Sequence, residues 1–136
     1  MKVKLDKHGH LPTRGHDTDA GLDLYAPMDI ALPADGVVKI DLGVSIQLPP
    51  STYGKIEGRS SLAARGIDVL GGVVDEGYRG EIAVVLKNNS SHRLTLNGGD
   101  RIAQLIVQPY IAVTPELVDE LDDTERGAGG FGSTGS

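Results

Sequence analysis

The sequence predicts an all-β fold, a barrel or a sandwich, in a single domain. Between residues 38 and 48, Val, Ile and Leu alternate with polar residues and glycine, and this period of two indicates a long half-buried strand or two joined strands. Helical periodicity is almost absent, with one candidate at residues 60–65 that Gly66 would end. Clusters of Pro, Gly, Asp and Asn separate the apolar runs and indicate turns.

The remaining elements follow from shorter patterns. We expect strands at residues 22–26, 30–32 and 101–107, where apolar and polar residues again alternate. Residues 82–86 are apolar on both faces, which predicts a strand in the centre of a sandwich or at a subunit contact. A chain of 136 residues has room for one domain, and its core must consist of Val, Ile, Leu and Ala because Trp is absent and Phe occurs once.

Composition excludes several classes of function. The net charge of −6 argues against broad binding to nucleic acids or anionic membranes, so neither is an expected partner. The absence of cysteine excludes disulfides, thiolate metal sites and cysteine nucleophiles. The first ten residues lack the apolar stretch of a signal peptide, and no apolar run elsewhere is long enough to span a membrane, so the expected location is cytoplasmic. The four histidines show no metal-ligand spacing and are expected at the surface.

The C-terminal residues 126–136 contain five glycines and predict a lid segment, mobile unless a ligand orders it, after a β-domain at residues 1–125. Glycine lets a backbone approach a ligand closely, and Arg126, Ser133 and Thr134 can donate hydrogen bonds to phosphate oxygens. Phe131 has no core to join here, and its ring suggests stacking on a base. The alternative is a solvated terminus, which is the usual meaning of a glycine-rich tail.

Two further segments could bind or activate a substrate. Arg59 and Ser60 lie where the short helix would begin, a place that favours an anion, although Ser60 could equally be an ordinary N-cap. Asp75 follows two valines and could act as a general base toward water, or it could simply form a turn with Gly77 in the left-handed conformation. Tyr78 could flank a sugar or join the core.

Two segments place polar groups on strands. Gln104 lies among apolar residues, where either a ligand oxygen or a neighbouring backbone group could pair with its amide. Three carboxylates lie between residues 17 and 23, with Asp23 on the polar side of its strand. Carboxylate oxygens suit Mg²⁺ that is held mainly by substrate phosphates, and the alternative is a plain acidic loop.

Taken together and in this order, the five segments resemble the five motifs of the homotrimeric deoxyuridine triphosphatase (dUTPase) family. The resemblance covers about residues 17–135. It implies a distorted jelly-roll-like barrel that hydrolyses dUTP to dUMP and pyrophosphate, with Mg²⁺ as cofactor and with three chains building shared active sites. It also implies that Asp75 activates the water that attacks the α-phosphorus, that Asp23 holds Mg²⁺ through water, and that Arg126 acts in catalysis at the γ-phosphate.

The resemblance further implies which residues bind the substrate. Tyr78 would pack against the deoxyribose and exclude a 2′-hydroxyl by shape. Phe131 would cover the uracil from the tail of another chain. The implied substrate-binding residues are Arg59, Ser60, Ser61, Gly72, Val73, Tyr78, Gln104, Phe131, Gly132, Ser133 and Thr134.

The sequence departs from the family pattern at two places. The hairpin before Asp75, which reads the uracil and often carries Asn in the family, here contains Val69 and Leu70, so base recognition would rest on backbone groups. Ser61 replaces a common glycine and creates an Arg-Ser-Ser run that also occurs in the related dCTP deaminases. The glutamate of those deaminases would fall at Val85, which cannot transfer protons, so deamination is not expected.

A function of a different class is a non-catalytic nucleotide-binding or regulatory protein that keeps the same scaffold. Such a protein could lose Asp75 without loss of binding. The presence of Asp75, Arg126 and Phe131 therefore favours the enzyme.

Overall fold

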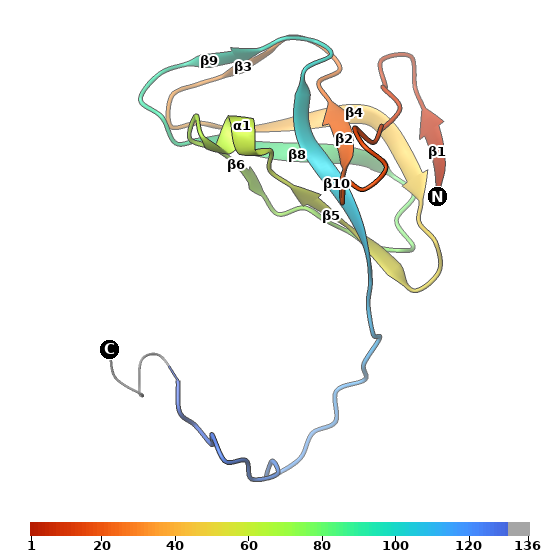
Figure 1. Cartoon of the computed structure of the whole chain (residues 1–136), viewed down its shortest axis with the longest axis vertical. Coiled ribbons are helices and arrows are strands. Elements are labelled where there is room, and N and C mark those ends of the chain that lie inside the picture. Colours follow the sequence, from red (N-terminus) through yellow and green to blue (C-terminus); the bar gives the residue numbers. More distant parts are fainter. Residues whose placement is uncertain (131–136) are drawn as a thin grey trace.

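The computed structural model describes residues 1–130 and places all but one of their regular elements in antiparallel β-sheets (Figure 1). One four-stranded sheet has the order β1-β4-β8-β6, a second has the order β2-β10-β5-β7, and β3 pairs with β9. The strands are β1 Lys2–Leu5, β2 Leu22–Tyr25, β3 Ile30–Leu32, β4 Val37–Gln47, β5 Thr52–Glu57, β6 Ile67–Leu70, β7 Val73–Val74, β8 Glu81–Asn88, β9 Leu94–Leu96 and β10 Arg101–Pro109.

The long strand β4 and its partner β8 form the centre of the first sheet. In β8, Ile82, Val84 and Leu86 are buried while Ala83 and Val85 are half-buried, so one face is core and the other remains apolar. The pairing of β4 with β8 is irregular between Asp41 and Ser45. Gly43 lies there with a φ of 67°, a left-handed conformation that glycine adopts without strain, and the long strand predicted for residues 38–48 is therefore one strand with a bulge.

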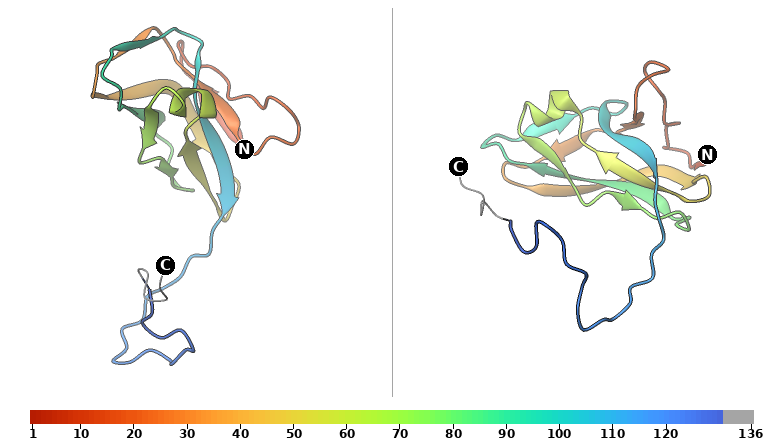
Figure 2. Two further views of the ribbon diagram at one scale, coloured as in Figure 1. Left: turned by 60° about the vertical axis from the view of Figure 1, so that its left-hand side comes forward. Right: turned by 60° about the horizontal axis from the view of Figure 1, so that its bottom comes forward.

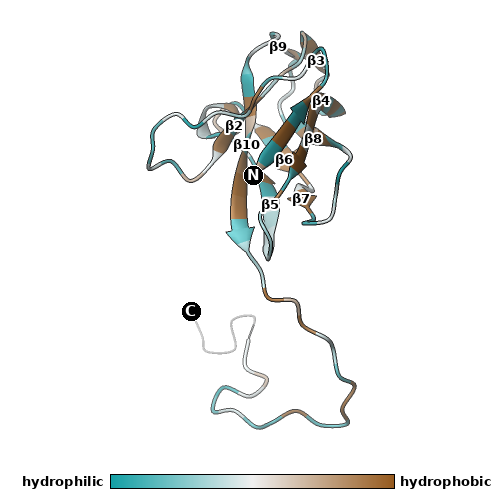
Figure 3. Ribbon diagram, turned by 90° about the vertical axis from the view of Figure 1, so that its right-hand side faces the viewer, coloured by the Kyte–Doolittle hydropathy of each residue, from teal (hydrophilic) through white to brown (hydrophobic). Residues whose placement is uncertain are grey.

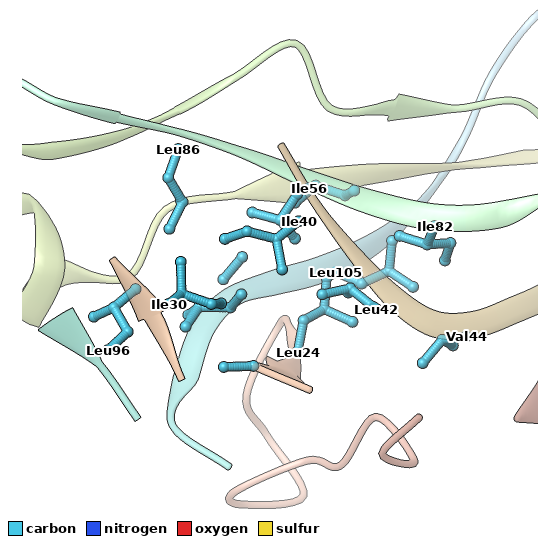
Figure 4. Packing of buried hydrophobic residues seen from close by; sticks show 14 of the residues in the cluster. Leu24, Ile30, Ile40, Leu42, Val44, Ile56, Ile82, Leu86, Leu96 and Leu105 are labelled. Atoms are coloured by element: carbon cyan, nitrogen blue, oxygen red, sulfur yellow. The ribbon is translucent and has the colours of Figure 1, made fainter. Parts of the chain in front are cut away.

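The core lies between the sheets and is aliphatic, as the composition predicted (Figure 4). Leu24, Ile56 and Leu105 from the second sheet face Ile40 and other residues of the first, including Leu42, Val44, Ile82 and Leu86. Hydrophobic segments follow the strands, while the connecting loops are mostly hydrophilic (Figure 3). Burial of these side chains supplies the main stabilisation of the fold.

The buried polar residue Asn88 ties two turns to this core. Its amide nitrogen donates to the backbone oxygens of Pro33 at 3.0 Å and His92 at 2.9 Å. Its amide oxygen accepts from the backbone nitrogen of Ser90 at 3.0 Å and from the Ser90 hydroxyl at 2.8 Å. Because these partners satisfy it, Asn88 can be fully buried at little cost.

The predicted helix is present as α1, Ser60–Ala63, and it is shorter than residues 60–65. Arg59 is the N-cap residue, and its side chain makes no capping hydrogen bond. At the other end, Arg65 and Gly66 donate to carbonyl oxygens three residues earlier, so the last turn tightens and ends the helix. Gly66 has a φ of 78°, the left-handed conformation expected of a terminating glycine.

Residues 110–130 form neither strand nor helix and leave the sheets as an extended arm (Figures 1 and 2). The arm therefore begins well before Arg126 and includes the acidic stretch at residues 116–125. It also carries exposed apolar side chains, namely Ile111, Val113, Leu117, Val118 and Leu121. Among residues 1–130, no helix combines the length and hydropathy needed to cross a bilayer.

Candidate active site

A polar pocket of about 380 Å³ lies where the second sheet meets the start of α1. Strand β2 contributes Asp23, β10 contributes Arg101 and Gln104, and the helix start contributes Arg59 and Ser60. The register explains this grouping, because Gln104 pairs with Asp23 across the two strands. The remaining lining residues are Gly15, His16, Asp19, Ala20 and Gly21, all from the loop before β2.

Asp23 is the central charge of this pocket. Its side chain is 14% exposed, and its two oxygens lie 3.1 Å from Arg59 Nε and 3.4 Å from Arg101 Nη1. Arg59 Nη1 also donates to the backbone oxygen of Arg101 at 3.4 Å. Arg59 and Arg101 balance the formal charges of Asp19 and Asp23 in this lining, and their guanidinium groups are donors that suit an anionic ligand.

Gln104 reaches across the pocket to the loop before α1. Its amide nitrogen donates to the backbone oxygen of Gly58 at 2.8 Å, so a neighbouring backbone group is one partner of this amide. Its amide oxygen packs against Gly21, where a Cβ atom would lie only 2.4 Å from it. Glycine at position 21 is therefore required for Gln104 to take this position.

The loop before β2 is held by contacts between its own side chains. The Asp19 carboxylate accepts from the backbone nitrogen of His16 at 2.9 Å and lies 3.3 Å from the His16 ring. Arg14 donates to the backbone oxygen of Asp19. The backbone hydrogen bond from His16 holds the pKa of Asp19 below its ordinary value. His16 is exposed, as predicted, and also lines the pocket. Arg101 was not predicted to be a site residue, although it opens the strand that carries Gln104.

A second pocket of about 350 Å³ surrounds Asp75. Asp75 follows the buried Val74 and is itself exposed at the end of β7. Its backbone oxygen accepts from the backbone nitrogen of Tyr78 at 3.0 Å, so Asp75 also begins a turn. Gly77 in that turn does not have a positive φ, contrary to the alternative considered from the sequence. The other residues of this pocket are Lys39, Ile56, Gly72, Val73, Tyr78, Glu81, Ile82 and Ala83.

Tyr78 lines the Asp75 pocket and is held in place by contacts with Gly80 and Glu81. Its hydroxyl donates to the backbone oxygen of Glu81 at 2.9 Å. Its ring packs over Gly80, where a Cβ atom would lie 2.4 Å from the hydroxyl oxygen. The hydrogen bond to Glu81 thus fixes the ring, and the lack of a side chain at Gly80 gives the ring its space. Tyr78 remains 46% exposed and can contact a ligand.

The hairpin expected before Asp75 is not formed, and this expectation was wrong. Strand β6 pairs with β8 in the first sheet, while β7 pairs with β5 in the second. Gly71 and Gly72 connect the two sheets, with φ values of 69° and 104°. At Gly72 a Cβ atom would lie 2.6 Å from the backbone oxygen of Ile56, and the Gly72 oxygen accepts from Ile56 nitrogen at 2.7 Å. Glycine there lets the backbone itself line the pocket.

The predicted site residues thus fall into separate groups on one chain. Asp23, Arg59, Ser60 and Gln104 share the first pocket, and Gly72, Val73, Asp75 and Tyr78 share the second. Ser61 is exposed on α1 beside Ser60. Arg126 lies in the arm, where its Nε donates to the backbone oxygen of Gly129 at 2.9 Å. Phe131, Gly132, Ser133 and Thr134 lie outside the described residues.

The carboxylates of residues 1–130 do not form a resident metal centre, because no three His, Asp or Glu side chains gather with ligand geometry in this part of the chain. In the first pocket, Asp23 offers one carboxylate between two arginines. A single carboxylate fits a Mg²⁺ ion that keeps its waters and is bound mostly by phosphate oxygens, and does not fit an all-protein cage.

Comparisons with known proteins agree on one family. The family model described as dUTPase matches residues 7–135. The deoxyuridine 5'-triphosphate nucleotidohydrolase of Paramecium bursaria Chlorella virus 1 is 48% identical over 99 residues, which are 72% of this chain and 70% of that protein. The mitochondrial enzyme of that name from Homo sapiens is 48% identical over 134 residues, which are 98% of this chain and 53% of that protein. The chain spans only part of these curated relatives.

Solved structures confirm the predicted jelly-roll-like β-fold. The Staphylococcus bacteriophage 80alpha dUTPase with dUPNHPP superposes with a TM-score of 0.92 at 26% identity, covering 99% of this chain and 98% of that chain. The dUTPase of phage phi11 of S. aureus, in a mutant form with a coordinated structural Mg(II) ion, has a TM-score of 0.83 at 23% identity, covering 90% of this chain and 98% of that one. At that identity the likeness concerns the fold alone.

Proposed function

This chain belongs to the dUTPase family, and we propose that it hydrolyses dUTP to dUMP and pyrophosphate by Mg²⁺-assisted attack of water on the α-phosphorus. Family membership was predicted from the five motifs and is confirmed, and with it the predicted enzyme class, dUTP diphosphatase, at the level of the family. The residue roles, the metal dependence and the assembly given below are proposals for this chain.

The observation that carries the proposal is the Asp75 pocket. A carboxylate at the end of a two-residue strand is exposed beside a fixed tyrosine ring and a glycine backbone. We assign Asp75 as the general base that takes a proton from the attacking water. Tyr78 packs on the deoxyribose, and because its ring is held by Glu81 and Gly80, it cannot move aside for a 2′-hydroxyl.

The base is read by backbone groups of residues 72 and 73. The backbone oxygen of Gly72 already accepts a hydrogen bond from Ile56. The polar atoms left at this end of the pocket are the backbone N–H of Gly72 and the neighbouring peptide groups. A pyrimidine edge can pair with such groups, and the absence of a Cβ at Gly72 keeps the space open. The region has no Asn, which agrees with recognition through the backbone.

The triphosphate occupies the pocket around Asp23. Arg59, Ser60 and Gln104 were expected to contact phosphates, and all three line this pocket; Arg101 adds a second guanidinium. An acidic protein needs such a local concentration of donors to bind a tetra-anion. Asp23 would hold the Mg²⁺ through water. The ion would offset charge on the phosphoryl oxygens, while the protein's arginines orient the chain of phosphates.

Assembly into a homotrimer with shared active sites explains why one chain divides these residues between two pockets. The base and sugar would bind in the Asp75 pocket of one chain, and the phosphates in the Asp23 pocket of another. The extended arm, with its exposed Ile111, Val113 and Leu117, has the apolar surface needed to contact a neighbouring chain. Its end would close the site with Phe131 on the uracil and with Arg126, Ser133 and Thr134 on the γ-phosphate.

A pyrophosphate assay tests this function directly. The protein is incubated with Mg²⁺ and each of dUTP, dTTP, UTP and dCTP, and pyrophosphate release is followed. We expect release from dUTP well above the other three. A nucleotide-binding protein without catalysis would bind dUTP yet release no pyrophosphate from any of them, and that result would exclude the enzyme.

A further inference from the structure

The residue next to the proposed base connects three separate parts of the chain. The Glu76 carboxylate accepts a hydrogen bond from the backbone nitrogen of Ser51 at 3.1 Å. The same carboxylate oxygen accepts from the Tyr110 hydroxyl at 2.9 Å. Glu76 follows Asp75, Ser51 lies in the turn before β5, and Tyr110 is the first residue after β10. One side chain thus joins the Asp75 turn to the point where the C-terminal arm leaves the sheet.

Ser51 and Tyr110 are also hydrogen-bonded to each other, so the three residues contact one another pairwise. The backbone nitrogen of Tyr110 donates to the backbone oxygen of Ser51 at 3.2 Å, directly after the pairing of Pro109 with Thr52. Ser51 has a φ of 60°, so its backbone is turned out of the strand conformation. Glu76 therefore accepts hydrogen bonds from the two residues at the end of the β5–β10 pairing, Ser51 and Tyr110. These bonds fix the direction in which the arm starts relative to the Asp75 turn.

The Asp75 turn is held from its other side as well. Arg79 Nη1 donates to the backbone oxygen of Glu76 at 2.8 Å and to that of Tyr78 at 2.9 Å. Tyr78 is bonded to Asp75 and to Glu81, as described above. Glu76 therefore contributes the one side-chain bond, among residues 1–130, that ties this turn to the arm.

We propose that Glu76 is a positioning residue that holds Asp75 and the root of the arm in a fixed relation. This inference rests on the proposed function, in which Asp75 is the base of one site and the arm of the same chain closes the site of a neighbouring chain. Displacement of a reacting group by about 1 Å can lower a rate by about 10²-fold, so a bond that fixes both groups affects turnover more than binding. The hydrogen bond to Glu76 and its negative charge raise the pKa of Tyr110 above its ordinary value of 10.0, as expected when the protonated hydroxyl is the donor.

A purely structural role is a weaker explanation of these contacts. Tyr110 is 42% exposed, and neither it nor Glu76 belongs to the buried core. A hydrogen bond at such an exposed position adds little to the free energy of unfolding. Its effect is expected instead on the geometry of the turn.

Four variants of the full-length chain test the proposal through dUTP kinetics. Glu76→Ala removes both bonds and is expected to lower kcat by about 10-fold with KM within about 2-fold of wild type. Tyr110→Phe removes one bond, and an intermediate loss is expected. Glu76→Gln keeps an oxygen that accepts from both donors, so kcat should stay within about 2-fold. Tyr53→Phe, which removes a bond of 3.0 Å to Gln108 on the same ladder, is the matched control and should leave kcat unchanged.

Amide hydrogen exchange of residues 75–80 provides a second readout that does not depend on turnover. Exchange should be faster in Glu76→Ala and in Tyr110→Phe than in wild type, and unchanged in Tyr53→Phe. Unchanged exchange in the first two variants, or a kcat for both within about 2-fold of wild type, overturns the proposal. If wild type itself releases no pyrophosphate, the proposed function is wrong, while the exchange result still decides whether Glu76 fixes the turn.

Discussion

At the scale of single residues, Asp75 is the group on which the proposed chemistry depends. Its carboxylate is exposed in a preformed pocket, and replacement by Asn keeps its size while removing its ability to accept a proton. We expect Asp75→Asn to lower the turnover of dUTP by roughly 10²- to 10⁴-fold, the usual contribution of a general base. Affinity for a non-hydrolysable analogue such as dUPNHPP, measured by calorimetry, should change little. A variant with normal turnover would remove Asp75 from the mechanism.

A second residue-scale prediction concerns pH. Lys87 Nζ donates to the Asp35 carboxylate at 2.5 Å and to the Asp35 backbone oxygen at 2.7 Å. The bond to the carboxylate lowers the pKa of Asp35 below its ordinary value of 3.8. A lowered folded-state pKa means that the ion pair stabilises the fold above pH 3.8 and loses this effect as the pH falls through the folded-state pKa. The Asp35 side chain is 87% exposed, so the contribution to the free energy of unfolding is small.

Asp35→Asn tests this ion pair. Asn tolerates the left-handed conformation of position 35, where φ is 51°, so the substitution changes charge without adding strain. The melting temperature of wild type should exceed that of the variant at neutral pH, and the difference should vanish in acid below the folded-state pKa of Asp35. A difference that grows on acidification would contradict the assignment.

Some site residues could be recognised from the sequence because their motifs are local. Asp23 and Gln104 share a pocket, as implied, and each stands in a short recognisable pattern. Arg101 and Glu76 were missed because their partners are distant in the sequence: Arg101 meets Asp23 across 78 positions, and Glu76 meets Tyr110 across 34. No local periodicity reports such contacts.

At the scale of elements, the strands with regular alternation were predicted well. Strand β4 stands out because its buried positions recur every second residue. The shorter strands β1 and β5 were not predicted: β1 is a charged edge strand with no buried residue, and in β5 only Ile56 is a buried large apolar side chain. The hairpin before Asp75, which the family resemblance implied, is not formed because β6 and β7 join different sheets, and the local sequence does not tell which sheet a strand joins.

The lid is the element whose removal is most informative. Among residues 1–130 the buried core ends at Leu105, so we expect deletion of residues 126–136 to leave the melting temperature unchanged. Because the deletion removes the donors proposed for the γ-phosphate, dUTP turnover should fall by about 10²-fold or more. An unfolded truncated chain, or one that loses its wild-type assembly, would instead assign these residues a structural role.

At the scale of the whole molecule, the separation of the two pockets predicts association. Sedimentation equilibrium of the purified protein should report three chains of 14.3 kDa each. The surfaces that would be covered are the outer face of β8 at Ala83 and Val85 and the exposed apolar residues of the arm. A monomer at concentrations where dUTP is hydrolysed would show that one chain suffices and would leave the shared site without support.

The aliphatic core has a consequence for spectroscopy. The chain has no Trp, and among residues 1–130 the four tyrosines all lie outside the buried cluster. Two of them are at the Asp75 turn: Tyr78 ends the turn, and Tyr110 donates a hydrogen bond to Glu76 within it. Near-ultraviolet absorption and fluorescence should therefore respond weakly to the packing of the interior and strongly to nucleotide. In this protein, the optical signal that usually reports folding is positioned to report the state of the proposed active site.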